Sequence, residues 1–153
     1  MDKTTFLTTL KTERAHLDQK LTGLTTAQLD TSPAPGEWSL KQNLAHLTFW
    51  EQFMLNNIRR WLETGETPTW MDNDEETRTN AQILEDSQSR PAEDVLADMR
   101  RSLAEVIALV ESLPENVLTD PHHVPWVNGR PLWTYIQNEA FGEHFEEHLK
   151  LGG

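Results

Sequence analysis

The chain has 153 residues, a length typical of one domain with a sizeable core. Its 13 Lys and Arg against 25 Asp and Glu give a formal net charge of −12, which repels phosphate backbones and anionic lipids. We therefore expect no nucleic-acid partner and no membrane partner. The absence of cysteine excludes disulfides and cysteine-ligated zinc, so a bound metal would need imidazole or carboxylate ligands. No apolar stretch has the length of a signal peptide or a membrane span, which predicts a cytoplasmic protein.

Four segments carry apolar residues every three or four positions, the spacing of amphipathic helices. The first begins around Phe6 and is expected to end near Gly23. Residues 31–36 contain two prolines and a glycine that cannot continue a helix. The second helix is expected to begin at the N-cap candidate Ser39, and its aromatic-rich pattern continues to about Glu63.

Two longer connections are predicted in the rest of the chain. Residues 64–86 lose the helical pattern and are expected to cross the bundle irregularly, with at most a short helix around 80–85. A third helix is predicted from Pro91 to the stop at Pro114, and a last one over about 132–149. The pattern predicts an all-α four-helix bundle in a single domain over residues 1–153, with longer crossings between helices two and three and between helices three and four.

Three histidines are candidates for a metal site inside this bundle. His144 and His148 are four residues apart and therefore neighbours on one helix face, in line with the apolar Ile136 and Ala140. His46 is the candidate third ligand from the second helix. Three imidazoles with an open position are the donor set of catalytic zinc and related divalent sites. The alternative is that these histidines are core residues hydrogen-bonded to carbonyls.

Other residues around the histidines allow further interpretations. Residues 144–148 (HFEEH) match the inverted zinc-protease pattern, but such enzymes take a third ligand from well downstream, and no ligating side chain follows. Glu51 and Glu143 are candidates to orient a ligating imidazole. His122 and His123 are expected in a solvated loop.

The block EWSLKQNLAHL at residues 37–47, followed by the pair His144 and His148, resembles the DinB/YfiT-like superfamily of metalloenzymes. The resemblance covers nearly the whole chain. It implies a four-helix bundle, commonly a homodimer, in which His46, His144 and His148 bind a divalent metal ion such as zinc or nickel.

Within this superfamily the chain also resembles the ClbS-like branch, which is associated with self-protection against reactive genotoxins. The similar features are Trp70 with the acidic run at 72–76, the segment LVESLPE at 109–115, and WVNGRPLW at 126–133. That branch often lacks the second histidine of the final pair, which this chain keeps as His148. The difference favours a metal-bearing member. Other relatives are S-transferases that use low-molecular-weight thiols.

The leading hypothesis is a divalent-metal-dependent hydrolase or thiol S-transferase, which activates water or a low-molecular-weight thiol against a reactive small-molecule electrophile in detoxification or a stress response. Trp50, Phe53, Trp126 and Trp133 are candidate substrate-binding residues, although aromatic residues at helical spacing are more often plain core. The alternative is a non-enzymatic bundle that binds a small molecule or a partner, with a structural metal, including a ClbS-like genotoxin-protection protein. A third hypothesis has no metal.

Overall fold

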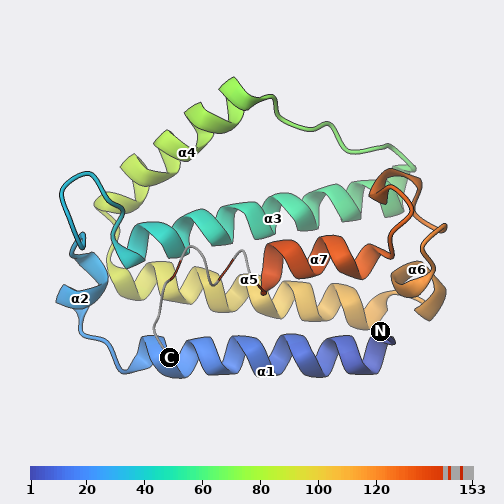
Figure 1. The fold of residues 1–153 in the computed structure, drawn as a ribbon, viewed down its shortest axis with the longest axis horizontal. Coiled ribbons are helices and arrows are strands. Elements are labelled where there is room, and N and C mark those ends of the chain that lie inside the picture. The colour runs from blue at the N-terminus through green and yellow to red at the C-terminus, as the bar shows by residue number, and fades with distance from the viewer. Residues whose placement is uncertain (143–144, 146–148, 150–153) are drawn as a thin grey trace.

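The computed structural model describes residues 1–142, 145 and 149. Over this part of the chain the fold is entirely helical and contains no strand, as Figure 1 shows. The elements are α1 (Lys3–Thr22), α2 (Thr26–Asp30), α3 (Leu40–Thr64), α4 (Asn73–Gln88), α5 (Ala92–Ser112), α6 (Glu115–Thr119), the 3-10 helix η1 (Pro125–Val127) and α7 (Leu132–Ala140).

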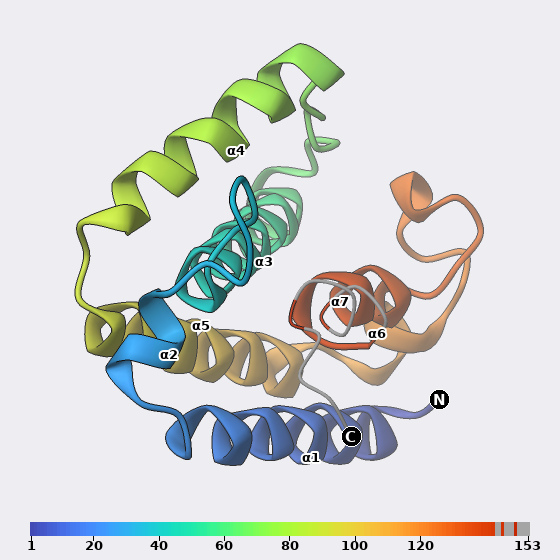
Figure 2. The same ribbon diagram turned by 60° about the vertical axis from the view of Figure 1, so that its left-hand side comes forward.

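The four-helix bundle predicted from the sequence is confirmed. Its members are α1, α3, α5 and the nine-residue α7, and α3 contacts α4, α5 and α7. In Figures 1 and 2, α4 lies on the outer side of α3, furthest from α1. None of the helices in the described residues is long and apolar enough to cross a membrane.

The limits of α3 agree closely with the prediction and follow from local capping. The Ser39 side chain accepts a hydrogen bond from the Gln42 backbone N–H, and the Gln42 side chain accepts one from the Ser39 N–H. This capping box satisfies two N–H groups that a helix start leaves without partners. The helix ends at Gly65, whose φ of 75° lies in the left-handed region that favours glycine.

The connection after α3 differs from the prediction, because α4 is a full helix of 16 residues. Asp72 caps it by accepting from the Glu75 N–H, and three acidic residues in its first turn interact favourably with the helix dipole. The helix packs on α3 and has one buried residue, Ser87. It therefore lacks the apolar stripe by which the other helices were predicted.

The last predicted helix is interrupted, since α7 ends at Ala140 while Phe145 and Leu149 are again helical. Phe141 is extended with φ −166°, and Gly142 has φ 87°, a left-handed conformation. The buried Phe141 ring contacts Phe6, with ring centroids 5.7 Å apart. The predicted face from Ile136 to His148 is therefore not one uninterrupted helical row.

The core consists of two apolar clusters of buried side chains. The larger includes Phe6, Leu10, Met54, Ile58, Val106, Val110, Leu118, Leu132 and Ile136. The smaller includes Leu21, Leu29, Leu44, Leu47, Val95, Met99, Phe145 and Leu149.

A buried ion pair also lies inside the bundle. Arg14 of α1 donates from Nη1 to Glu51 Oε2 of α3 over 2.5 Å and to the Ala140 carbonyl over 3.0 Å. It also donates to the Met99 carbonyl over 3.2 Å, and its guanidinium lies 5.1 Å from the Phe145 ring centroid. Arg14 thus joins its own helix, α1, to α3, α5 and the end of α7 through charge-assisted hydrogen bonds.

Candidate functional site

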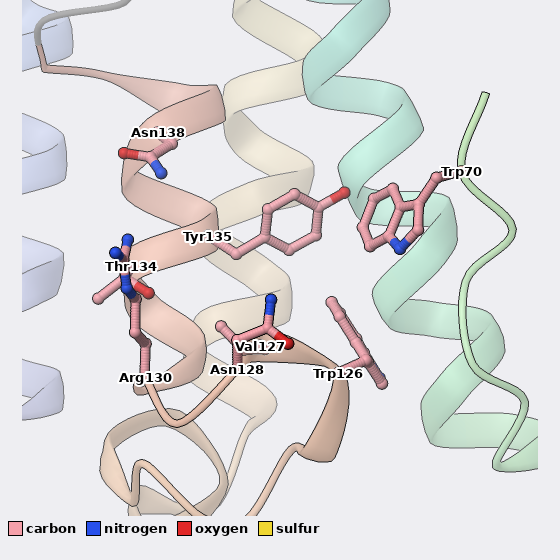
Figure 3. A pocket seen from close by; sticks show the side chains of 8 residues that line it. All are labelled: Trp70, Trp126, Val127, Asn128, Arg130, Thr134, Tyr135 and Asn138. Carbon is pink, nitrogen blue, oxygen red and sulfur yellow. The ribbon is translucent and has the colours of Figure 1, made fainter. Parts of the chain in front are cut away.

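A pocket of about 360 Å³ opens where α7 meets η1 and the loop between α3 and α4. Its volume is at the lower end of the range usual for small-molecule sites. Figure 3 shows the side chains around it, which are Trp70, Trp126, Val127, Asn128, Arg130, Thr134, Tyr135 and Asn138. The pocket combines an aromatic wall with several polar groups.

The aromatic wall consists of Trp70, Trp126 and Tyr135. The ring centroids of Trp70 and Trp126 are 6.1 Å apart, those of Trp70 and Tyr135 5.8 Å, and those of Trp126 and Tyr135 5.6 Å. The planes are inclined by 62–87°, in the edge-to-face geometry that aromatic rings prefer. The ring of Trp61 on α3 also contacts that of Trp126, with centroids 6.3 Å apart. Trp70 remains 52 % exposed, so part of this wall is accessible to a ligand.

Two polar groups reach the pocket because the chain turns sharply between η1 and α7. Asn128 and Gly129 both have left-handed backbones, with φ of 58° and 76°. Asparagine and glycine are the residues that adopt this conformation at least cost. The turn presents the side chains of Asn128 and Arg130 beside Thr134 and Asn138 of α7.

Glu139 is a largely buried carboxylate of α7 that does not line the pocket. Glu139 follows Tyr135 by one turn on the same face of α7. Burial, together with the negative charges of Glu51 on α3 and Glu76 on α4, raises its pKa to about 7. Burial also raises the pKa of the Tyr135 phenol, whose oxygen accepts a hydrogen bond from Asn57 Nδ2 over 3.2 Å. Glu139 is therefore a carboxyl group that exchanges a proton near neutral pH.

The candidate metal ligand His46 is buried on α3, with 6 % of its surface exposed. Its ring centroid lies 5.0 Å from that of Trp38 and 6.5 Å from that of Trp50. The residues that the structure describes contain no group of three His, Asp or Glu side chains arranged to hold a metal ion. The other two predicted ligands, His144 and His148, lie outside the described residues, as does Glu143.

The neighbours of these two histidines in the sequence are described. Phe145 and Leu149 are buried in the same cluster as Leu44 and Leu47 of α3. Leu47 directly follows His46 in the sequence. Phe145 and Leu149 therefore pack beside the turn of α3 that carries His46, while the three-histidine site stays a prediction.

The four predicted substrate-binding residues lie in different surroundings. Trp126 lines the pocket. Trp50 donates from Nε1 to Asn80 Oδ1 over 2.9 Å, and its ring contacts that of Phe53. Trp133 packs on Phe6 against the larger core cluster. Their role in binding substrate stays a prediction.

Sequence reasoning singled out most of the pocket residues but did not group them into one site. Trp70 and the segment 126–133 were noted for their resemblance to the ClbS-like branch, but nothing in the sequence brought them together. The remaining lining residues, Thr134, Tyr135 and Asn138, lie on α7. The available signal was that Trp70 and the segment WVNGRPLW both belong to the ClbS-like resemblance, from which a shared site could have been predicted.

Three other residues singled out in the sequence lie within the described part of the chain. Glu51, a candidate to orient an imidazole, forms the buried ion pair with Arg14. His122 and His123 are exposed after α6, as expected.

Solved structures share this fold. The crystal structure of the colibactin self-resistance protein ClbS in complex with a dsDNA matches with a TM-score of 0.76 and 19 % identity, over 98 % of this chain and 90 % of that one. A protein from Streptococcus pneumoniae matches with a TM-score of 0.80 and 12 % identity, over 98 % of this chain and 89 % of that one. The curated proteins contain no match.

The ClbS complex corrects one expectation from the sequence. The net charge of −12 led us to exclude a nucleic-acid partner, and this exclusion is wrong, because a protein of the same fold has been crystallised with dsDNA. Net charge sums over the whole surface, whereas the stability of a complex depends mainly on the charges at the contact. Salt screens the effect of charges elsewhere on the protein. A negative total therefore does not remove nucleic acid as a class of partner.

The family follows from the sequence as a whole. The model of the DinB superfamily matches residues 9–149, from the middle of α1 to Leu149. Both the all-helical bundle and the resemblance noted from residues 37–47 agree with this match. The chain belongs to the DinB superfamily.

Proposed function

We propose that this protein protects the cell against a reactive small-molecule electrophile by binding the compound in the pocket of Trp70, Trp126 and Tyr135. The main observation behind the proposal is the pocket, because its lining combines accessible aromatic surface with polar groups that can orient a ligand. The shared fold with ClbS, a self-resistance protein, supports a protective role.

The chemistry of the pocket fits a compound with an aromatic group. Rings of a ligand pack on the exposed part of Trp70 and beside Tyr135, which contributes burial of apolar area and edge-to-face contacts. The ClbS complex adds duplex DNA as a candidate partner, and Trp70 with Arg130 supplies a stacking surface and a cation for such a contact.

The first test uses Trp70→Ala in bacteria challenged with styrene oxide, an aromatic epoxide that alkylates DNA. Wild-type protein is expected to increase survival, and the variant is expected to lose most of this protection. Because the Trp70 side chain is half exposed, its removal costs the core little buried apolar area, and the variant should fold.

Leu62→Ala is the matched control, since Leu62 is a 43 % exposed apolar residue of α3 that does not line the pocket. It should protect as well as the wild type. Equal survival with Trp70→Ala and wild type, at equal protein levels, would show that the pocket is not the protective site.

A divalent metal is the second part of the proposal. His46, His144 and His148 would hold it as three neutral imidazoles, and the packing of Phe145 and Leu149 beside Leu47 supports this grouping. A metal bound there would lower the pKa of a bound water or thiol and so supply a nucleophile. The homodimer and the role in a stress response, which the resemblance implied, stay predictions.

Elemental analysis of untagged protein after loading with zinc or nickel tests the metal. About one ion per wild-type chain is expected, and His46→Ala should lose it. His123→Ala, which removes an exposed imidazole in the loop before η1, should keep it. If His46→Ala holds as much metal as the wild type, or the wild type holds none, the three-histidine site is refuted.

A further inference from the structure

The pocket has two chemically different sides. In Figure 3, Trp70 and Trp126 lie on one side, Arg130, Thr134 and Asn138 lie on the other, and Tyr135 stands between them. A ligand that fills the pocket therefore contacts aromatic rings at one end and polar groups at the other.

Arg130 is the charged group of the polar side. Its side chain is exposed, and it forms no ion pair with any residue that the structure describes. By contrast, Arg14 pairs with Glu51 and Arg100 with Asp18. No carboxylate lines the pocket, so nothing there neutralises the Arg130 guanidinium.

The neighbours of Arg130 extend its capacity to bind an anion. The amide groups of Asn128 and Asn138 each carry two N–H donors and lie on the same pocket surface. The Thr134 hydroxyl donates its one proton to the Pro131 carbonyl over 2.8 Å, so the donors left for an anion are the Arg130 guanidinium and the two amides. A guanidinium matches the two oxygens of an oxyanion with paired hydrogen bonds, which are roughly twice as strong as neutral ones.

We infer that the ligand of this pocket is a planar aromatic compound that carries an oxyanion, with its ring against Trp70, Trp126 and Tyr135 and its oxyanion on the Arg130 guanidinium. The inference rests on the proposed function and names the substrate class of the same pocket. The overall negative charge opposes it little, because exposed charges beyond about 8 Å are largely screened at physiological salt.

Unreactive probes test the inference without any chemistry on the ligand. Calorimetric titrations compare 2-naphthoate with 2-naphthamide, which has the same ring and no charge, and with 2-naphthylmethylamine, which has the opposite charge. Wild-type protein is expected to bind the naphthoate about tenfold more tightly than the amide and to bind the amine most weakly. Arg130→Leu should abolish this preference, and Arg130→Lys should retain part of it.

Arg101→Leu is the matched control, because it removes an exposed cation from α5 that does not line the pocket. It should keep the preference for naphthoate. Equal affinities for the three probes, lost together in Trp70→Ala, would overturn the inference while leaving the pocket as the proposed site. No binding of any probe would overturn both.

Discussion

The Arg14→Met variant is expected to lose about 3–5 kcal/mol of the free energy of unfolding. The methionine fills most of the space of the arginine stem but leaves the Glu51 carboxylate buried at 1 % side-chain exposure without its ion partner. It also removes the donors to the Ala140 and Met99 carbonyls. An uncompensated buried charge and two lost hydrogen bonds place this substitution among the most destabilising in the chain.

Urea unfolding at pH 7 measures the loss, and two further variants isolate its cause. Arg101→Met removes an exposed arginine of α5 and should change stability by less than about 0.5 kcal/mol. Arg14→Met combined with Glu51→Leu removes both charges and should be more stable than Arg14→Met alone. If Arg14→Met unfolds within about 1 kcal/mol of the wild type, the ion pair does not hold the bundle together.

The second large effect is a pH dependence that Glu139 confers on stability. Its pKa is about 7 in the folded protein against 4.5 in the unfolded chain, mainly because of burial. Between these values the folded protein keeps a proton that the unfolded chain has released. The free energy of unfolding therefore falls as pH rises from 4.5 to 7, by roughly 1–3 kcal/mol after allowance for partial exposure.

The Glu139→Gln variant should remove this part of the pH dependence. Unfolding curves with a chelator present are expected to coincide for variant and wild type at low pH, and to favour the variant above neutral pH. Glu63→Gln, which removes an exposed carboxylate from α3, should follow the wild-type profile. Parallel profiles for Glu139→Gln and wild type would contradict the assignment of the shift to this residue.

Most of the fold could be predicted from the sequence because its long helices combine an apolar stripe with clear end signals. Ser39, Pro91 and Pro114 mark helix limits that the structure places within a residue or two. α4 was missed because it packs through one side on α3 and buries only Ser87, so its residues lack a helical apolar period. The end of α7 was missed because Phe141 leaves the helical conformation to bury its ring beside Phe6.

Less of the candidate site could be predicted. The pocket joins Trp70 to Tyr135 across 65 positions of the chain, and no periodicity encodes such a contact. The histidine spacing indicated a metal site from local geometry, but the break at Phe141 and Gly142 separates this segment from the apolar row of Ile136 and Ala140 with which the prediction aligned it. What favours the histidine grouping is tertiary packing, through Phe145 and Leu149 against Leu47.

The most direct test of the proposed function is the yield of alkylated guanine in duplex DNA exposed to styrene oxide, with purified protein present. Wild-type protein should reduce the yield in proportion to its concentration, or catalytically if metal loading adds turnover. Trp70→Ala should lose most of this effect, and Leu62→Ala should keep it. An adduct yield unchanged by wild-type protein, with and without metal, would contradict a protective role for this pocket.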